Sequence, residues 1–188
     1  MFDQQHIGEL QNGQIGIIPT DTLYGIVGLA LNADVVERIY ELKQRDGDKP
    51  FIILISEIVD LKKFNIQLSD EQQKYLENVW PGALSIILSC PGDEFKYLHR
   101  GKRSLAFRLP KNEELRGLLK QTGPLVAPSA NLQDQPPAYT IQQAKEYFGD
   151  RVNFYLDIGV LRVEPSTLVD LTGDRPKMLR QGVVKLVS

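Results

Sequence analysis

The sequence predicts a protein of the α/β class, built from strands and helices that alternate along one chain. Short apolar stretches of strand length are separated by longer stretches with helical periodicity. Hydrophobic residues make up 42% and charged residues 24% of the 188 residues, which is typical of globular proteins. Because no repeat or linker divides the chain, we expect a single domain over residues 1–188.

The apolar pattern places the elements in order from the N-terminus. The first half is predicted to contain a strand at 14–18, a strand at 26–31, a helix at 33–45 and a strand at 51–55. The second half is predicted to contain a helix at 69–79, strands at 84–89 and 104–109, a helix at 112–121, a strand at 125–127, a helix at 140–148 and strands at 153–157, 167–171 and 183–187.

The helix starts carry the clearest local signals. Asn32 or Asp34 can cap the helix at 33–45, because a short polar side chain can accept a hydrogen bond from the first turn. A hydroxyl residue followed three positions later by glutamine, the capping-box pattern, opens the helices at 69–79 and 140–148. The residues concerned are Ser69 with Gln72 and Thr140 with Gln143.

Composition excludes several classes of protein. The longest apolar runs, such as 51–55, are far shorter than the roughly 20 residues that span a bilayer, so we expect no membrane segment. The first six residues do not have the pattern of a secretory signal, and the single Cys90 cannot form an internal disulfide, so we expect a cytoplasmic protein. A net charge of -2 argues against nonspecific coating of nucleic acid, although a local basic patch can still bind phosphate groups.

Familiar catalytic motifs are missing from the sequence. It has no Gly-x-Ser-x-Gly elbow, no His-Glu-x-x-His and no paired-cysteine zinc pattern. His6 and His99 are its two imidazoles, and Cys90 follows an apolar stretch where a structural thiol is expected. A protein nucleophile and a dedicated metal site are therefore not favoured.

A polar loop at 19–25, Pro-Thr-Asp-Thr-Leu-Tyr-Gly, lies between two apolar stretches. Loops at strand ends commonly form ligand sites in α/β sheets, so the hydroxyl groups here can face a small polar ligand. A turn whose threonine and aspartate side chains bond the local backbone explains the same residues.

Three cations, Lys43, Arg45 and Lys49, lie within seven residues at the end of a predicted helix. The helix dipole alone favours Lys43 and Arg45 at this end. Alternatively, the three side chains surround a polyphosphate, with arginine making forked contacts and lysine acting as a point charge. The segment lacks the glycine pattern of a Walker A loop.

Further polar residues lie at the ends of predicted strands. Ser129 and Asn131 point the same way on an extended turn, so both can face one ligand, although an ordinary turn explains them equally. Ser104 and Arg108 share one face of the strand at 104–109, and a cation inside a strand requires a partner. The remaining candidates in this group are Ser166 and Arg180.

In their order and spacing these segments resemble the YrdC/TsaC family of threonylcarbamoyl-AMP synthases, from about residue 14 to about residue 182. Each motif is weak alone, whereas the combination is specific. The matching pieces are the loop at 19–25, Lys43-x-Arg45, Trp-Pro-Gly at 80–82, Arg-Leu-Pro at 108–110, Ser129-x-Asn131, Pro-Ser-Thr at 165–167 and Arg180.

The resemblance implies a twisted mixed sheet with flanking helices around a deep, positively charged cavity. It implies catalytic roles for Lys43 and Arg45, which we expect on a solvated wall of that cavity. The positions that match L-threonine binding are Thr22, Arg108, Ser129 and Ser166. The positions that match ATP binding are Arg45, Lys49, Ser104, Asn131, Tyr139 and Arg180.

The resemblance also implies a reaction and partners. Threonine and bicarbonate would form N-carboxythreonine, whose new carboxylate attacks the α-phosphate of ATP and expels pyrophosphate. Mg²⁺ would enter with ATP, held by phosphates and water. The product would serve the N6-threonylcarbamoyladenosine (t6A) modification of tRNA with TsaD-, TsaB- and TsaE-type proteins, and tRNA or double-stranded RNA is a possible ligand.

Several residues depart from the family pattern. Asp46 stands where many members have proline, Lys49 where asparagine is common, Leu54 where histidine can occur and Asp134 where glycine is usual. Leu54 removes a possible polar contact to threonine. Because the sequence ends at Ser188, we expect it to lack the extra C-terminal domain of longer relatives. The alternative is a YciO-like paralogue or an RNA-binding module without the activity, for which the basic run at 99–103 is suggestive.

Overall fold

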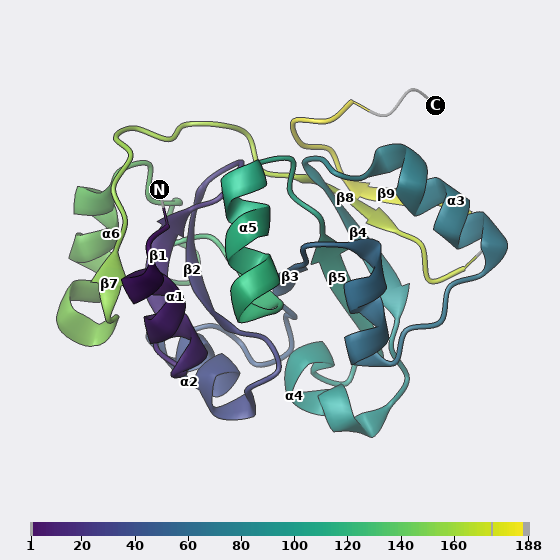
Figure 1. Ribbon diagram of the computed structural model, residues 1–188, viewed down its shortest axis with the longest axis horizontal. Coiled ribbons are helices and arrows are strands. Elements are labelled where there is room, and N and C mark those ends of the chain that lie inside the picture. Colours follow the sequence, from purple (N-terminus) through teal and green to yellow (C-terminus); the bar gives the residue numbers. More distant parts are fainter. Residues whose placement is uncertain (1, 174, 186–188) are drawn as a thin grey trace.

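Nine strands form one twisted, mixed sheet across residues 2–173 and 175–185, the part of the chain that the computed structural model describes (Figure 1). The strand order is β7-β1-β2-β6-β3-β5-β4-β8-β9. The pairs β7–β1, β3–β5 and β4–β8 are parallel, and the other neighbours are antiparallel. The strands are β1 (Gly16–Pro19), β2 (Tyr24–Leu29), β3 (Ile52–Leu54), β4 (Leu84–Ser89), β5 (Ser104–Arg108), β6 (Leu125–Val126), β7 (Phe154–Tyr155), β8 (Thr167–Asp170) and β9 (Lys177–Arg180).

Helices cover both faces of this sheet. The α-helices are α1 (Gln4–Gln11), α2 (Ala33–Lys43), α3 (Asp70–Val79), α4 (Lys96–His99), α5 (Glu113–Thr122) and α6 (Ile141–Phe148). Short 3-10 helices are η1 (Ile58–Phe64), η2 (Asp93–Phe95) and η3 (Gly149–Arg151). Within the described chain, no helix has the length and apolar character needed to cross a membrane.

The predicted α/β class and mixed sheet are confirmed, and most elements lie within a few residues of their predicted positions. The strand predicted at 183–187 is wrong: residues 183–185 are not a strand, and 186–187 lie outside the described residues. The last strand is instead β9, which pairs with β8. The sequence analysis also missed α1, α4 and η1.

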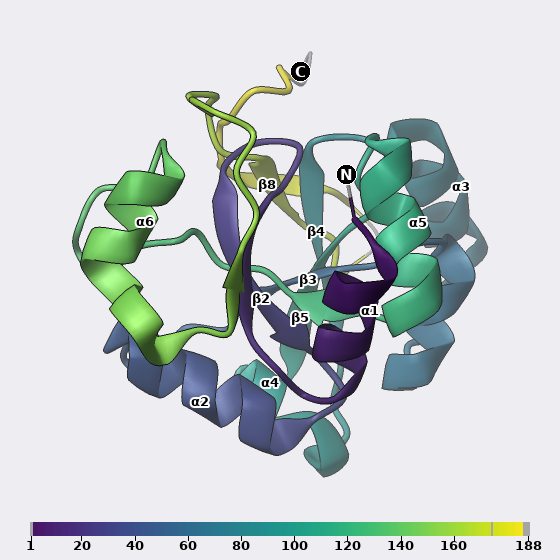
Figure 2. The same ribbon diagram turned by 60° about the vertical axis from the view of Figure 1, so that its left-hand side comes forward.

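Two apolar cores lie on opposite faces of the sheet. On one face α1 and α5 lie side by side, and Ile7 and Leu10 pack in the same core as Leu115 and Leu118 (Figures 1 and 2). On the other face α2 and α6 contribute to the larger core (Figure 2). Gly28 lets β2 approach α2, because a Cβ at this position would collide with Val35 Cγ1.

The helix starts follow the sequence with one exception. Asn32 caps α2 by accepting a hydrogen bond from Val35 N, and Ser69 and Gln72 form the predicted capping box of α3. At α6, Thr140 accepts from Gln143 N, but the Gln143 side chain accepts from Tyr139 N instead of completing the box. The second predicted capping box is therefore wrong, and Gln143 helps to hold Tyr139.

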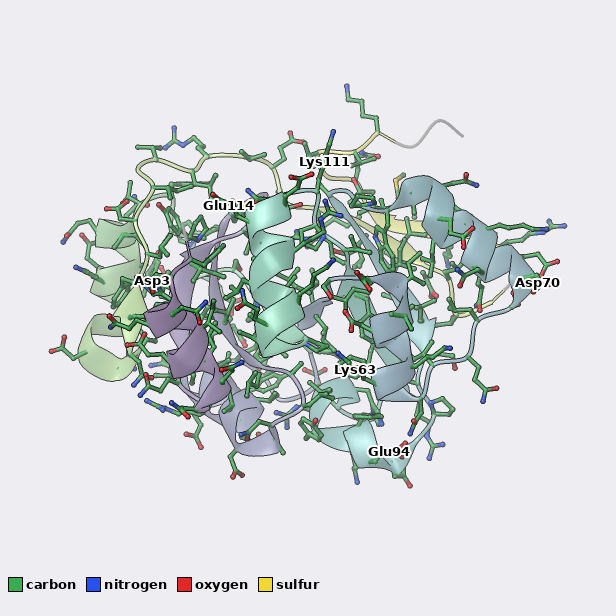
Figure 3. All side chains as sticks on the ribbon, in the orientation of Figure 1. Asp3, Lys63, Asp70, Glu94, Lys111 and Glu114 are labelled. Atoms are coloured by element: carbon green, nitrogen blue, oxygen red, sulfur yellow. The ribbon has the colours of Figure 1, made fainter. Side chains whose placement is uncertain are left out.

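Carboxylates gather at helix starts, where the helix dipole favours negative charge. Figure 3 shows Asp3 at the start of α1, Asp70 at the start of α3 and Glu114 at the start of α5. These side chains account for part of the acidic residues on the outer surface.

Candidate active site

Two adjoining cavities bring together most of the predicted site residues. The first, which we call the Arg108 cavity, has a volume of about 490 Å³ and is lined by Thr22, Arg108 and Ser166 among others. The second, the Arg45 cavity, has a volume of about 440 Å³ and is lined by Arg45 and Lys49 among others. The residues lining both, and hence forming a shared wall, are Ile52, Pro128, Ser129 and Arg180.

Arg108 is the central charge of the first cavity. It lies at the end of β5 with its side chain 5% exposed, and its Nη2 forms an ion pair of 2.9 Å with Asp21 Oδ1. Its Nη1 donates a hydrogen bond of 3.1 Å to Thr22 Oγ1. Burial lowers the pKa of Arg108 and Asp21 opposes this shift, so the guanidinium remains charged.

Arg108 still has a donor available. Its buried Nε makes no hydrogen bond to any described residue, and neither does Asp21 Oδ1, whose ion pair with Arg108 lacks hydrogen-bond alignment. A buried arginine N–H without an acceptor is costly unless a ligand completes it. An anionic group such as a carboxylate suits this position because arginine binds carboxylates in a forked geometry.

The loop before β2 serves both functions that the sequence left open. Thr20 holds the turn, since its Oγ1 donates to Leu23 O at 2.6 Å and accepts from Leu23 N at 3.2 Å. Thr20 and Thr22 both line the Arg108 cavity, and Thr22 also contacts Arg108. The turn interpretation is therefore right for Thr20, and the ligand interpretation fits the position of Thr22.

The opposite side of the Arg108 cavity is formed by Ser166 and Arg180. The hydroxyl of Ser166 is buried and lies 2.8 Å from Ser85 Oγ, while Arg180 Nη2 donates to Ser166 O at 2.9 Å. Gly182 packs closely on this segment, because a Cβ there would collide with Pro165 O. These contacts hold Ser166 next to Arg180 on the shared wall.

Arg45 and Lys49 form one side of the Arg45 cavity. Arg45 Nε donates to Lys49 O at 3.2 Å, and its guanidinium lies 5.4 Å from the centre of the Phe51 ring. Partial burial lowers the pKa of Arg45, which nonetheless keeps its charge. Ser104 and Lys102 line the cavity beside them.

Lys43 is not on a solvated wall, so that expectation is wrong. Its side chain is 1% exposed, and its Nζ donates to Ser129 O at 2.5 Å, Asn131 O at 2.6 Å and Asn131 Oδ1 at 3.2 Å. Burial, with Arg45 nearby, lowers the pKa of Lys43 to about 7. Lys43 lies on the same buried face of α2 as Ile39 and Tyr40, and the helix ends there because Gln44 adopts a left-handed conformation.

Asn131 and Tyr139 also differ in place from the other predicted nucleotide residues. Asn131 lies behind the cavities, where its Oδ1 accepts from Ser129 Oγ at 2.6 Å and its Nδ2 donates to Gln135 O at 2.6 Å. Tyr139 lines the Arg108 cavity, with the guanidinium of Arg162 4.9 Å from its ring centre.

Asp46 and Asp134, two residues that depart from the family pattern, lie in the loops that carry the site. Asp46 N donates to Gln133 Oε1 at 2.5 Å, and Asp46 Oδ2 accepts from Gln133 Nε2 at 2.8 Å and from Lys49 Nζ at 3.1 Å. Asp134 adopts a left-handed conformation with φ 61°, which explains why glycine suits this position. Lys49 is therefore paired with Asp46 at the cavity edge.

Leu54 has a different environment from the one its sequence position suggested. It is fully buried in the core beneath α1 and α5 and pairs in register with Arg108. Its side chain supplies apolar packing next to the buried arginine.

Positive charge dominates the lining of both cavities. The described lining residues with cationic side chains are Arg45, Lys49, Lys102, Arg108, Arg162 and Arg180, and those with carboxylates are Asp48 and Glu164. Sequence reasoning did not single out Asp21, Ser85 or Arg162. Asp21 could have been found, because it lies inside the loop at 19–25 and Arg108 required an anionic partner. Ser85 carries no local signal, since only the β4–β8 pairing places it beside Ser166.

Comparisons with known proteins show the family to which this chain belongs. The family model for Sua5, YciO and YrdC, described as "Telomere recombination", matches residues 9–182. Threonylcarbamoyl-AMP synthase of Bacillus subtilis is 31% identical over 92% of this chain and 51% of its own length. Threonylcarbamoyl-AMP synthase of Photobacterium profundum is 28% identical over 95% of this chain and 98% of its own length.

Solved structures are similar over the same region. Sua5 of Pyrococcus abyssi, crystallised with L-threonine, has a TM-score of 0.84 and 29% identity, covering 97% of this chain and 55% of that one. Escherichia coli YciO has a TM-score of 0.84 at 23% identity, covering 96% of this chain and 89% of that one, and this likeness shows the fold alone. The chain spans about half the length of the Bacillus and Pyrococcus proteins.

Proposed function

Because this chain belongs to the Sua5/YciO/YrdC family, we propose that it is a threonylcarbamoyl-AMP synthase that joins L-threonine, bicarbonate and ATP. The observation that carries the proposal is the pair of adjoining cavities that share Ser129 and Arg180 on one wall. One cavity suits an amino acid and the other a polyphosphate. We propose that the domain formed by residues 1–188 carries the whole reaction.

The Arg108 cavity binds L-threonine. Arg108 takes the substrate carboxylate with its guanidinium, which Asp21 and Thr22 hold in place. Ser166 and Ser129 line the same cavity and supply hydroxyl groups. The supporting feature is the buried positive charge of Arg108 on the cavity lining, which favours a small anionic ligand.

The Arg45 cavity binds ATP. Arg45, Lys49 and Arg180 surround the phosphates, and Ser104 lies on the same wall. Tyr139 lies across the shared wall in the Arg108 cavity, so it contacts the nucleotide only near the junction of the two cavities. Lys43 and Asn131 act from behind by holding the Ser129 segment, which replaces the direct catalytic contact first expected for Lys43.

The reaction follows from this juxtaposition. The threonine amine attacks the bicarbonate carbon, losing water, and forms N-carboxythreonine. A carbamate oxygen then attacks the α-phosphorus of ATP, forming a mixed anhydride while the bond to pyrophosphate breaks. Such transfers depend on positioning and charge neutralisation rather than on a protein nucleophile. Arg45 and Arg180 would neutralise charge on either side of the reacting phosphate.

We place Mg²⁺ with ATP rather than in a protein cage. When bound, it would supply positive charge that offsets the negative charge of the phosphates. Asp48, on the wall of the Arg45 cavity, is a hard oxygen donor that suits a magnesium ion through water.

The product is a mixed carbamic–phosphoric anhydride, which water destroys. A second enzyme must therefore consume it promptly, and a TsaD-type transferase with TsaB- and TsaE-type proteins would pass the threonylcarbamoyl group to tRNA as t6A. This role implies a cytoplasmic location, where ATP and tRNA are found. Direct binding of tRNA or double-stranded RNA by the cations around the Arg45 cavity belongs to the same proposal.

Product formation tests the proposal directly. The protein is incubated with ATP, L-threonine, labelled bicarbonate and Mg²⁺, and labelled threonylcarbamoyl-AMP and pyrophosphate are measured with each substrate omitted in turn. We expect product only when all three substrates are present. A folded protein that binds ATP or RNA but forms no adenylate would contradict the proposal and favour the YciO-like or RNA-binding alternative.

A further inference from the structure

Tyr40, on the inner side of α2, makes an unusual set of contacts behind the Arg45 cavity. It is 5% exposed, and its hydroxyl donates a hydrogen bond of 3.0 Å to Lys49 O. The same carbonyl accepts from Arg45 Nε at 3.2 Å. Burial raises the pKa of Tyr40, so the phenol stays protonated and continues to donate. One backbone oxygen therefore ties Tyr40 to Arg45.

A stack of rings and cations makes a second connection between the same residues. The Tyr40 ring lies 3.9 Å from the Phe51 ring, centre to centre, at an interplanar angle of 19°. The guanidinium of Arg45 lies over the Phe51 ring, 5.4 Å from its centre. Phe51 itself lines the Arg45 cavity. Ring-to-cation contacts of this kind favour one orientation of the guanidinium.

The stack is anchored at its outer end. The guanidinium of Arg100 lies 3.8 Å from the Tyr40 ring centre, and its Nη2 pairs with Glu37 Oε2 at 2.9 Å. Arg100 reaches α2 because it ends α4 in a left-handed conformation with φ 50°. A continuous series of contacts thus runs from the surface of α2 to the cavity wall.

From these contacts we propose that Tyr40 is a positioning residue for the nucleotide. It holds Arg45 and the Lys49 carbonyl in the arrangement that receives the phosphates, without lining either cavity among the described residues. The inference rests on the proposed function for its substrate. It concerns ATP alone, because Tyr40 contacts Lys49 and Phe51, which line the Arg45 cavity and not the Arg108 cavity.

The chain offers a closely matched control. Tyr97 is a partly buried tyrosine whose hydroxyl donates to Ala30 O at 3.0 Å, the same kind of bond at the same length. Tyr40→Phe and Tyr97→Phe each remove one such hydroxyl and keep the ring. A general loss of stability should be similar in both variants, whereas an effect on Arg45 should arise from Tyr40→Phe alone.

The experiment compares the KM values for ATP and threonine, and the Kd of the ATP analogue AMP-PNP, which is titrated by calorimetry without threonine or bicarbonate so that no adenylate forms. We expect Tyr40→Phe to raise the KM for ATP and the Kd of AMP-PNP about five-fold, with the KM for threonine unchanged. Tyr97→Phe should leave all three constants within about two-fold of wild type. Equal behaviour of the two variants would overturn the inference.

A double-variant cycle shows whether Tyr40 acts through Arg45. Arg45→Lys keeps the charge but removes the Nε–H that shares the Lys49 carbonyl. In that background, we expect Tyr40→Phe to weaken AMP-PNP binding by less than about two-fold. A full five-fold effect in both backgrounds would contradict the positioning role.

Failure of the proposed function gives a different result. If wild type forms no adenylate, the synthase reaction is excluded, while the AMP-PNP titrations still decide the role of Tyr40 in nucleotide binding.

Discussion

The two cavities are built in different ways, although they share a wall. The Arg108 cavity is organised by buried side chains that contact one another: Arg108 with Asp21 and Thr22, and Ser166 with Ser85. The Arg45 cavity is formed by a loop after α2 that is held through a main-chain carbonyl, ring contacts and half-exposed charges. The arrangement of the Arg108 cavity suits a small rigid substrate, and that of the Arg45 cavity suits a flexible polyphosphate. Changes in the Arg108 cavity should therefore have larger and more selective effects.

The largest effect is expected from Arg108→Gln. Glutamine removes the positive charge and leaves Asp21 buried without its cation. We expect the KM for threonine to rise about 100-fold or more, with little change in AMP-PNP binding. Steady-state kinetics with varied threonine, together with calorimetry for AMP-PNP, measure both effects. A similar loss of affinity for both ligands would mean that Arg108 does not belong to a separate amino-acid cavity.

A smaller effect, on stability rather than on binding, is expected from Lys43→Met. The change removes the buried donor of Asn131 O and one of the donors of Ser129 O and Asn131 Oδ1, and should lower the free energy of unfolding by about 2 kcal/mol. Lys120, in the last turn of α5 with its side chain 58% exposed, is the matched control. Lys120→Met should change the free energy of unfolding by less than about 0.5 kcal/mol in urea titrations. Equal losses would contradict the buried role of Lys43.

The same lysine predicts a dependence of stability on pH. Its folded pKa of about 7 lies below the ordinary value of 10.5, so the unfolded chain binds more protons between these values. Wild-type stability should therefore rise with pH in this window relative to Lys43→Met, by at most about 1.4 kcal/mol per pH unit. Urea titrations of both proteins from pH 7 to 9 measure the difference. If the difference in the free energy of unfolding between wild type and Lys43→Met fell with rising pH, the lowered pKa of Lys43 would be contradicted.

The smallest effect is expected from Asp46→Ala. The variant frees Lys49 and removes the hydrogen bond that Asp46 Oδ2 accepts from Gln133 Nε2. The loop that carries Arg45 therefore loses one support. Because these groups are exposed, we expect the KM for ATP to rise only about two- to three-fold, with the KM for threonine unchanged. Asp93→Ala, which removes an exposed partner of Arg103, is the control for a general charge effect. If Asp46→Ala changed only the KM for threonine, the two cavities would not be independent in this way.

Local signals explain why so much of the fold was predictable. The apolar periodicity of the strands and the caps at Asn32 and Ser69 act over a few residues, and the structure keeps both. The strand at 183–187 failed because residues 183–185 do not form a strand, whereas β9 forms from exposed residues that pair with β8. Pairing between distant segments decides whether such a stretch forms a strand, and apolar periodicity carries no information about that pairing.

The residues of the candidate site also divide into those that the sequence predicted and those that it did not. Motif order predicted which residues line the cavities, including Thr22, Arg108 and Arg180. It did not separate Lys43 from Arg45, because the left-handed turn at Gln44 has no glycine to signal it. Nor did it identify Tyr40, whose importance depends on a carbonyl and a ring that the fold brings to it.

The most direct test of the two-cavity account is a crossed binding experiment. Threonine and AMP-PNP are each titrated by calorimetry into wild type, Arg108→Gln and Arg45→Gln. The account predicts that Arg108→Gln weakens threonine binding with little change for AMP-PNP, and that Arg45→Gln weakens AMP-PNP binding with little change for threonine. If each variant weakened both ligands equally, the two cavities would not be separate binding sites.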